Sequence, residues 1–555
     1  MKNRILLFFF IGFLLLFVSC GTSKSMHHKP DLSHYNSAKP IVVKKSDSVF
    51  ISGKNSLLKN KQGIWELYTE GDPLEIGLNT GALTDSLLKN QQQIFFSKVK
   101  DFIPSGFQQK ILRQFLKWYN RKLYLNVPEE YQTEIYGVSE YTSDELNNIA
   151  PKYQRGLYLH AAHDIGHALQ DLALVGCSSF AAWNEKSEDG NLILGRNFDF
   201  YVNDAFAENK IVAFINPKAG YKFMMVTWPG MVGAVSGMNQ EGLTVTINAS
   251  KSKIPLSAKT PISILTREIL QHAATIDEAI SIAKKRKVFV SESIMVGSAN
   301  DNKAILIEVS PKKMDVYDVP NSDQLICSNH FQGDAFAADK RNQEQIINSH
   351  SEYRFERMQE LLAENPKVNP EIASEILRNK NGLKDIPLGY GSEKALNQLM
   401  AHHGIIFKPK EKLVWVSANP YQLGEFVCYD LNSVFGERKN DATISFQKEN
   451  LNIAKDPFLE TAAFRNYKIF KVEDHKIDSF LENKETISPE FIQNYQSLNP
   501  DYWVVYYKAG LYFYQIKDFQ QAELNFEKAL TKEITTLPEK EKIEKYLKKI
   551  KRKLK

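Results

Sequence analysis

The sequence predicts an α+β domain made of β-hairpins and grouped helices. Short apolar runs separated by polar turns recur between residues 177 and 431, and each pair predicts an antiparallel hairpin. Two helical patterns follow one another over residues 263–287 instead of alternating with single strands. Residues with helical spacing also precede and follow this part of the chain. Grouped hairpins and grouped helices favour layered sheets and helices over alternating βαβ units.

The N-terminus is typical of a secretion signal. Lys2 and Arg4 precede an apolar run over residues 5–18, which is short for a membrane-spanning helix. The next residues, Ser19-Cys20-Gly21, resemble a bacterial lipobox. This resemblance implies cleavage before Cys20 and lipidation of its thiol, which would anchor the protein on a bacterial membrane facing the periplasm or the cell surface. The alternative is an ordinary signal peptide with a chance cysteine.

Composition divides the chain of 555 residues into five segments. Residues 1–20 form the signal and lipobox, and residues 21–63, rich in Ser, Lys, His and Pro, are expected to be a flexible tether. Residues 64–435 form the main domain, with a mostly helical N-terminal portion that starts at residue 64. Residues 436–490 are expected to be a helical connection, and residues 491–555 a small helical domain.

After the helical portion, the sequence of the main domain predicts a series of hairpins with helices between them. Each hairpin has two apolar runs around a polar turn, and each helix has apolar residues three or four apart. The predicted hairpins cover residues 177–198, 210–228, 232–250, 304–319 and 404–431, and the predicted helices cover 263–287 and 351–363.

The segment "YYKAGLYFYQIKDFQQAELNFEKAL" resembles one tetratricopeptide (TPR) unit, although the usual proline after its second helix is missing. One such unit cannot bury its apolar face alone. It must pack on the main domain, on the Lys-rich terminal helix over residues 539–555, or on a protein partner. We interpret the terminal helix as a solvated cap, with contact to an anionic membrane as the alternative. The small and aromatic positions of the unit are Gly510, Phe513, Ala522, Phe526 and Ala529.

Charge and cysteine count restrict the function further. The formal net charge is +5, and no stripe of arginines and aromatics accompanies it, so we expect no nucleic-acid partner. If Cys20 carries lipid, three cysteines remain: Cys177, Cys327 and Cys428. An odd number leaves at least one free thiol in an exported protein, whether or not Cys327 and Cys428 pair.

The predicted hairpin over residues 177–198 brings a cation and a carboxylate close to Cys177. If Trp183 faces Asn191, the residue opposite Cys177 is near Asn197, and Arg196 and Asp199 lie within a residue or two of the thiol. A neighbouring cation lowers the pKa of a thiol, and a carboxylate can orient an amine or a base.

The base for this thiol has two possible sources. A Cys–His dyad with His330, His402 or His403 is conceivable, but nothing near these histidines in the sequence supports it. Cleavage before Cys177 would instead create an α-amino group with a pKa of about 8, able to accept a proton near neutral pH. Gly176 suits such a bond, because glycine permits strain and leaves its carbonyl open to attack.

Five motifs in this order resemble the isopenicillin-N acyltransferase-like family. They are "GCSSF", "GRNFDF", "GMNQEGLTVTINAS", "IMVG" and "SNHF". Members of this family are autoproteolytic N-terminal-nucleophile (Ntn) hydrolases, related to penicillin V acylase and bile-salt hydrolase. The resemblance covers about residues 65–431 and implies a four-layer αββα sandwich, here with a helical N-terminal portion and a small C-terminal helical appendage.

The resemblance assigns roles to individual residues. It implies that Cys177 is the nucleophile, exposed by cleavage after Gly176, and that Asp199 holds the Cys177 amine. It also implies that Asn248 donates to the oxyanion and that Asn329 supports the nucleophile and the substrate amide. Asparagine can donate to an oxyanion without titrating.

Two arginines match the family less closely. Arg196 matches an arginine of the bile-salt-hydrolase branch, where other members vary. A second family arginine has no clear counterpart in this sequence, and Arg354 is a candidate, with a surface position on a helix as the alternative.

These observations predict an Ntn cysteine amidohydrolase or acyltransferase that acts through an acyl-thioester on a small acyl-amide substrate. No trusted coenzyme A motif is present, and we expect no cofactor. Hydrolysis and transfer both stay open, as does the substrate. A different class of function is a non-catalytic lipoprotein that binds a partner through its TPR-like unit.

A histidine cluster offers a competing site. His160, His163 and His167 share one helix face at metal-ligand spacing, close to Asp164. No glutamate lies between two of them as in H-E-x-x-H, and no other ligand cluster is evident. We therefore expect no metal, and we expect these histidines to line the interface beside Cys177.

Overall fold

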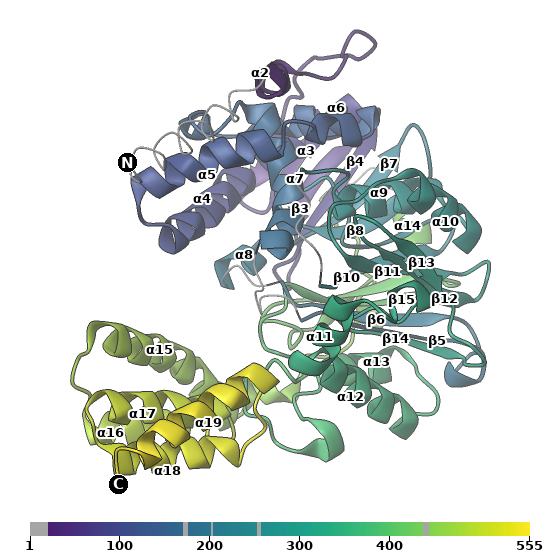
Figure 1. Ribbon diagram of the computed structural model, residues 1–555. Coiled ribbons are helices and arrows are strands. Elements are labelled where there is room, and N and C mark those ends of the chain that lie inside the picture. Colours follow the sequence, from purple (N-terminus) through teal and green to yellow (C-terminus); the bar gives the residue numbers. More distant parts are fainter. Residues whose placement is uncertain (1–19, 170–175, 201–203, 252–256, 437–442) are drawn as a thin grey trace.

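The computed structural model has the predicted α+β architecture (Figure 1). It describes residues 20–169, 176–200, 204–251, 257–436 and 443–555. The predicted signal peptide lies outside these residues, apart from Cys20, whose side chain is also not described. No helix in the described part of the chain is long and apolar enough to span a membrane.

Two sheets form the centre of the molecule. Among the strands that the structure describes, neighbours are antiparallel, as the predicted hairpins require, except for the parallel pair β4 and β7. The larger sheet has the order β1 (Val43–Ser46), β2 (Val49–Ser52), β3 (Asn55–Lys59), β4 (Trp65–Gly71), β7 (Ile211–Pro217), β8 (Phe223–Thr227), β9 (Ser236–Asn239), β10 (Leu243–Ala249), β11 (Glu292–Ser298), β12 (Lys303–Val309), β13 (Met314–Tyr317). The smaller sheet has the order β14 (Gln324–Cys327), β5 (Ser178–Ala182), β6 (Ile193–Phe198), β15 (His403–Lys408), β16 (Leu413–Ser417), β17 (Phe426–Asp430).

The sheets pack face to face and helices cover their outer faces, which confirms the four-layer αββα prediction (Figure 1). Helices α9 (Ile262–His272) and α10 (Ile276–Lys285) lie on the larger sheet. Helices α12 (Ser351–Glu364) and α13 (Pro370–Leu377) lie on the smaller sheet. Because both faces of the central strands are covered, strands such as β10 are buried along their whole length.

The N-terminal part differs from the sequence-based prediction. The predicted tether over residues 21–63 is too long, because residues 43–59 form β1, β2 and β3 of the larger sheet. Residues 65–71 form strand β4, where we expected a helix. The parallel partner of β4 is β7, well over a hundred residues away, so the local pattern did not reveal this strand. Four of the five residues of β3 and the first five of β4 are buried.

The predicted helical portion follows β4 and contains a very close helix contact. Helices α3 and α6 touch along their backbones: a Cβ at Gly77 would lie 2.2 Å from the Glu134 carbonyl oxygen, and one at Gly137 would lie 2.7 Å from the Leu78 nitrogen. In chain order the helices are α2 (Cys20–His27), α3 (Pro73–Leu83), α4 (Asp85–Phe102), α5 (Gly106–Tyr119), α6 (Glu129–Ser139), α7 (Lys152–Leu169), α8 (Asp204–Glu208).

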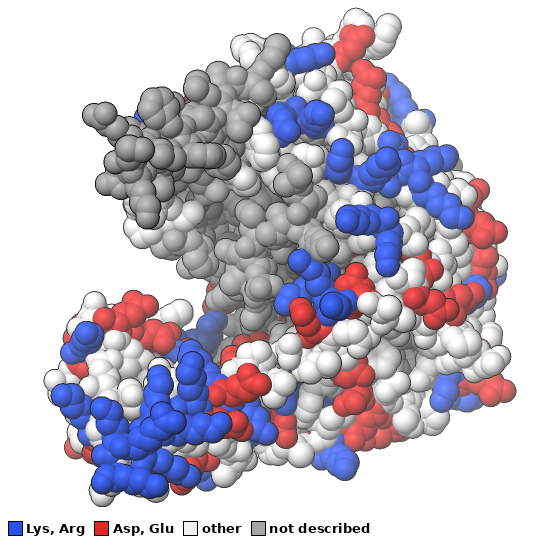
Figure 2. Space-filling view, viewed as in Figure 1, with Lys and Arg blue, Asp and Glu red and all other residues white. Residues whose placement is uncertain are grey.

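The C-terminal helices form a unit of their own against the main domain. Their core also includes Leu399 and Leu423 of the main domain, and Asn499 exchanges two hydrogen bonds with the Tyr390 backbone. The TPR-like segment forms α17 and α18, and α19 packs against α18. Lys and Arg side chains gather over α19 (Figure 2). The remaining helices are α11 (Lys340–Asn348), α14 (Leu431–Phe435), α15 (Ala462–Asn483), α16 (Pro489–Leu498), α17 (Trp503–Gln515), α18 (Phe519–Leu530), α19 (Leu537–Lys551).

Candidate active site around Cys177

Cys177 directly precedes β5 of the smaller sheet. The β5–β6 hairpin pairs Ser178 with Asn197 and Ser179 with Arg196, one residue away from the register considered above. The turn between the strands thus returns Arg196 and Asp199 to the thiol, as predicted. Cys177 is 1% exposed, and Arg196 and Asp199 are fully buried.

Arg196 is the cation beside the thiol. Its Nη2 donates to Cys177 Sγ at 3.7 Å, and it also donates to the Ile247 carbonyl. Its Nη1 donates to Ser236 Oγ at 2.5 Å and to the Val235 carbonyl at 3.1 Å. These contacts fix the guanidinium against β9 and β10, so the charge stays beside the sulfur.

The net effect on the thiol differs from the prediction. Burial raises the pKa of Cys177 to about 11, although Arg196 acts in the opposite direction. Asp199 and Glu292 contribute to this rise in pKa, and Arg354, like Arg196, opposes it. A neighbouring cation therefore does not produce a thiolate in the intact chain, because loss of solvent outweighs it. The sulfur needs a base before it can attack.

Asp199 is a buried carboxylate placed next to the predicted cleavage point. Its backbone carbonyl accepts from the Gly176 N–H at 3.3 Å. Burial raises the pKa of its carboxyl to about 7, and Arg354 and Arg196 partly counter this rise. Gln422 also favours the ionised form, although no hydrogen bond of normal geometry reaches either carboxylate oxygen among the described residues. A carboxyl group with this pKa can exchange a proton near neutral pH.

Arg354 is fully buried in the site, so the surface alternative for this residue is wrong. It is carried by α12, and its Nη1 donates to the Gly176 carbonyl at 2.8 Å, the Cys177 carbonyl at 2.6 Å and Ser178 Oγ at 2.8 Å. Its Nη2 donates to Asn329 Oδ1 at 2.6 Å. Burial lowers the pKa of Arg354 to about 10, so the guanidinium remains charged near neutral pH. Arg354 therefore contacts both peptide carbonyls around the predicted cleavage point.

Gln398 also contacts the Gly176 carbonyl. This residue lies in the loop before β15, is 1% exposed, and donates from Nε2 to the Gly176 oxygen at 2.8 Å. The sequence carries no motif around Gln398 that would have marked it. The Gly176 carbonyl is thus held by two buried donors and is not open as we expected.

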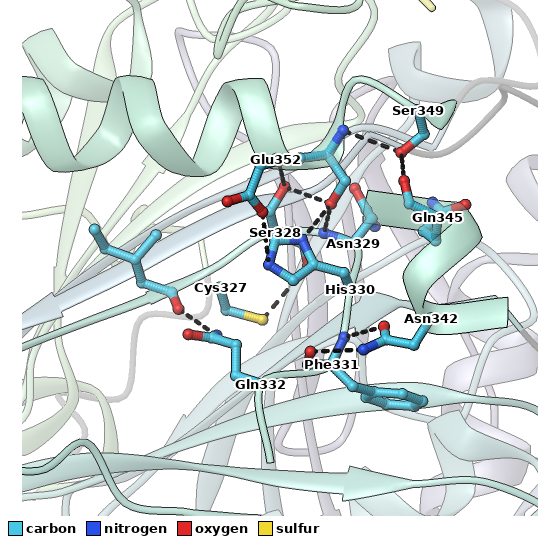
Figure 3. Close-up of polar contacts among 12 residues, drawn as sticks. Cys327, Ser328, Asn329, His330, Phe331, Gln332, Asn342, Gln345, Ser349 and Glu352 are labelled. Carbon is cyan, nitrogen blue, oxygen red and sulfur yellow. Dashed lines mark hydrogen bonds and ion pairs between the residues drawn. The ribbon is translucent and has the colours of Figure 1, made fainter. Parts of the chain in front are cut away.

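Asn329 orients Arg354. Its Oδ1 accepts from Arg354, and its Nδ2 donates to the Ala249 carbonyl at 2.8 Å. Its backbone N–H donates to Ser351 Oγ at 2.8 Å. Figure 3 shows Asn329 and His330 beside the first residues of α12, close to Glu352.

Asn248 holds the neighbouring backbone. Its Nδ2 donates to the Cys327 and Ser328 carbonyls at 3.1 and 3.2 Å, and its Oδ1 accepts from Ser179 Oγ at 2.8 Å. These contacts join β10 to the end of β14 and to β5. In the intact chain the amide hydrogens of Asn248 are therefore engaged away from the Gly176 carbonyl.

The histidines named as bases serve other partners. His330 Nδ1 hydrogen-bonds with Ser351 Oγ at 2.9 Å, and its Nε2 lies 3.4 Å from Glu352. His403 Nε2 hydrogen-bonds with Ser236 Oγ at 2.9 Å, and its Nδ1 faces His402 Nδ1 at 2.9 Å. His403 therefore hydrogen-bonds to Ser236, which also accepts from Arg196, and these bonds direct both of its ring nitrogens to groups other than the sulfur.

The alternative metal site gains no support from its described members. His160 Nδ1 bonds to the Gly156 carbonyl at 2.7 Å, and its Nε2 accepts from the Val232 N–H at 2.8 Å. Asp164 Oδ2 accepts from the Ile262 N–H at 2.8 Å and so caps α9. The side chains of His163 and His167 lie outside the described residues. Within the described part of the chain, no group of three potential ligands is assembled for a metal.

The other two cysteines do not pair. Cys327 ends β14 and Cys428 lies in β17, and both are buried free thiols, like Cys177. Burial raises the pKa of Cys327 well above its usual value and that of Cys428 to about 12. Neither is a thiolate near neutral pH.

Comparison with known proteins confirms the family resemblance. Residues 183–419 match the family model described as acyl-coenzyme A:6-aminopenicillanic acid acyl-transferase. The match begins six residues after Cys177 and includes Arg196, Asp199, Asn248, Asn329, Arg354 and Gln398. The matched residues make up less than half of the chain.

Three curated proteins also match part of this chain. An uncharacterised protein of Archaeoglobus fulgidus is 24% identical over 46% of this chain and 45% of its own length. The protein dcd1B of Dictyostelium discoideum is 25% identical over 47% of this chain and 52% of its own length. An N-acylethanolamine-hydrolyzing acid amidase of Caenorhabditis elegans is 24% identical over 38% of this chain and 58% of its own length. The matches thus span about half the length of these relatives.

Two solved structures are also similar. The Caenorhabditis elegans N-acylethanolamine-hydrolyzing acid amidase ortholog has 18% identity and a TM-score of 0.31 over 42% of this chain and 93% of that chain. The conjugated bile acid hydrolase of Clostridium perfringens has 14% identity and a TM-score of 0.32 over 48% of this chain and 98% of that chain.

Proposed function

We propose that this protein cleaves its own chain between Gly176 and Cys177 and then acts as an N-terminal-cysteine amidohydrolase or acyltransferase. The observation that carries the proposal is the arrangement around Cys177. A buried thiol, a cation, a carboxyl group and two donors to the preceding carbonyl meet at one peptide bond. Such a set supplies a nucleophile, a group that can take a proton, and charge stabilisation for an acyl-transfer reaction.

Self-cleavage would begin with attack of Cys177 Sγ on the Gly176 carbonyl carbon. A C–S bond forms, the C–N bond between the two residues breaks, and the thiol proton ends on the departing nitrogen. Asp199, which titrates near neutral pH, is placed to carry that proton. Water then attacks the thioester, so that the Gly176 carboxylate leaves and the Cys177 thiol is restored. The new α-amino group of Cys177 is the base for later turnovers.

The mature enzyme would repeat the same chemistry on an external amide. Cys177 attacks the substrate carbonyl, the amine leaves with a proton, and an acyl-thioester forms. Water completes hydrolysis, and an amine in place of water completes transfer. The proposed substrate is a small acyl amide; Cys177 itself packs in an apolar cluster with Phe198 and Ile247. The acid amidase from Caenorhabditis elegans, whose name states hydrolysis of N-acylethanolamines, agrees with this class.

We also propose that Cys20 carries lipid and anchors the protein to a bacterial membrane. The proposal rests on the N-terminal sequence pattern. Labelling cells with a fatty-acid analogue should mark the wild type and not the Cys20→Ser variant. Equal labelling of both would contradict the anchor.

The deciding experiment is intact mass and N-terminal sequencing of the wild type beside Cys177→Ala. The wild type should give two fragments, one of which begins at Cys177, and the variant should stay in one piece. Cleavage that persists in Cys177→Ala would contradict the mechanism. An intact wild type whose Cys177 resists a thiol-reactive acyl probe would favour the non-catalytic alternative, in which the helical unit binds a partner.

A further inference from the structure

Gln398 makes a contact that the roles described above do not explain. Its Nε2 donates to the Gly176 carbonyl at 2.8 Å, and Arg354 Nη1 donates to the same oxygen at 2.8 Å. Both donors are buried, so water does not compete with them. A peptide oxygen with two buried donors is already surrounded as an oxyanion would need to be.

The close approach of Gln398 also explains why residue 176 is glycine. A Cβ at this position would lie 2.2 Å from Gln398 Nε2 and 2.8 Å from its Cδ. Any other residue would push the amide away from the carbonyl. The glycine thus leaves room for the Gln398 amide to reach the carbonyl, an explanation different from the strained bond expected from the sequence.

The asparagine that the family resemblance assigned to the oxyanion is occupied elsewhere. Asn248 Nδ2 donates to the Cys327 and Ser328 carbonyls. The intact chain thus has Gln398 and Arg354, and not Asn248, in contact with the oxygen on which negative charge would develop.

We propose that Gln398 is an oxyanion donor for cleavage of the Gly176–Cys177 bond, acting together with Arg354. The proposal rests on the self-cleavage set out under the proposed function. When Cys177 Sγ attacks, the carbonyl double bond opens and its electron pair moves onto the Gly176 oxygen. The Gln398 Nε2 hydrogen and the Arg354 guanidinium stabilise this charge. The charge returns to the carbonyl as the C–N bond breaks and the nitrogen takes the thiol proton.

The test follows cleavage of the pulse-labelled full chain over time. Gln398→Met keeps the side-chain volume and removes the donor, and it should slow cleavage on the order of 100-fold. Gln154→Met is the matched control. Gln154 is 3% exposed and donates to the Ser25 and His28 carbonyls instead of the Gly176 carbonyl. This control should cleave at the wild-type rate.

Hydroxylamine distinguishes slow formation of the thioester, which loss of an oxyanion donor would cause, from slow hydrolysis of the thioester. It cleaves thioesters directly, so it would rescue a variant that forms the thioester and fails only to hydrolyse it. We expect no rescue of Gln398→Met, because this variant is slow to form the thioester. Wild-type cleavage of Gln398→Met, or full rescue by hydroxylamine, would overturn the proposal.

A double-mutant cycle tests the link to Gly176. Gly176→Ala should slow cleavage because the new methyl group displaces the Gln398 amide. If so, Gly176→Ala combined with Gln398→Met should be little slower than Gly176→Ala alone. Fully multiplicative effects would contradict a shared mechanism.

The outcomes also separate this inference from the proposed function. If the wild type itself is not cleaved, the proposed function fails. If the wild type is cleaved, Cys177→Ala is not, and Gln398→Met keeps the wild-type rate, only the role of Gln398 fails. A fall in melting temperature of Gln398→Met large enough to account for the slower cleavage would also reject the role.

Discussion

At the scale of single residues, Arg354 has the most partners in the site. It donates to two peptide carbonyls, one serine hydroxyl, one asparagine amide and the His350 ring, and all of these groups are buried. Loss of its side chain would leave several buried acceptors without donors, which is costly for both stability and charge stabilisation. The arginine is therefore both a structural tie between α12 and β5 and a part of the reaction centre that we propose.

We predict that Arg354→Met reduces self-cleavage by at least about 100-fold and lowers the free energy of unfolding by about 3–5 kcal/mol. Intact mass over time gives the cleavage rate, and urea titration gives the stability. Arg357→Met is a matched control. Arg357 is equally buried on α12, but its guanidinium pairs with Glu360 and Asp385 instead of the Gly176 and Cys177 carbonyls. This control should lose stability and retain cleavage; a similar cleavage defect in both variants would reject the special role of Arg354.

The raised pKa of Asp199 should make the stability of the protein depend on pH. Its carboxyl pKa is raised from 3.8 to about 7 in the folded chain, so between these values the folded state holds a proton that the unfolded state has lost. This contribution to stability is present at low pH and is lost as pH rises towards 7. Relative to Asp199→Asn, the wild type should lose up to about 1.4 kcal/mol of stability for each pH unit across this window.

Chemical denaturation of the uncleaved Cys177→Ala background at several pH values would measure this difference. An equal pH dependence with and without Asp199 would show that its carboxyl is not raised. In the cleavage-competent chain, the rate should increase as pH rises through about 7, because Asp199 then becomes ionised and able to accept a proton.

At the scale of elements, the contact between α3 and α6 depends on the absence of side chains. Both Gly77 and Gly137 face the partner helix at backbone distance. Glu134, which lies in this contact, forms a buried ion pair with Arg267 of α9 at 3.0 Å. The crossing therefore positions the helical region on the larger sheet.

Gly77→Ala should destabilise the protein by about 1–3 kcal/mol, because its methyl group forces the helices apart. Gly106→Ala is the matched control: Gly106 starts α5, and no atom lies within 4 Å of the position of its Cβ. This change should be neutral or stabilising by up to about 1 kcal/mol. Thermal unfolding of the two variants compares them, and equal destabilisation would contradict the close crossing.

Local patterns predicted most elements of the main domain but failed where partners are distant. The hairpins β5–β6, β7–β8 and β9–β10 were visible because both strands and their turn lie within one short stretch. The local pattern does not predict strand β4, because its parallel partner β7 is remote, and the weak periodicity of β1–β3 favours a tether instead of strands.

Distance along the sequence also decides which site residues can be predicted. Cys177, Arg196 and Asp199 share one hairpin, and motif resemblance added Asn248 and Asn329. Gln398 lies over two hundred residues from Gly176 in a loop without a motif, and only the folded chain brings them together. The burial that raises the pKa of Cys177 is likewise a property of the packed layers and not of its neighbours in sequence.

At the scale of the whole molecule, the proposed cleavage point divides the larger sheet. Strands β1–β4 precede Gly176, and β7–β13 follow it, yet β4 and β7 pair over seven residues each. Buried contacts also cross the point, including Glu134 with Arg267 and Asp164 with the Ile262 N–H.

The two fragments should therefore stay together after cleavage. Size-exclusion chromatography under native conditions should give one particle of the full mass, and a denaturing gel should separate two chains. A matched sample of uncleaved Cys177→Ala should elute at the same position. Release of the N-terminal fragment without denaturant would contradict this expectation.

The pairing of β4 with β7 also affects recovery after denaturation. While both strands belong to one chain, each meets the other at the high effective concentration that a covalent connection provides. Once the connection is cut, the protein becomes a heterodimer whose interface was assembled within a single polypeptide. Denatured chains would then have to find each other in solution and rebuild a sheet from its middle, in competition with aggregation. We expect the cleaved protein to unfold irreversibly under conditions from which Cys177→Ala still refolds.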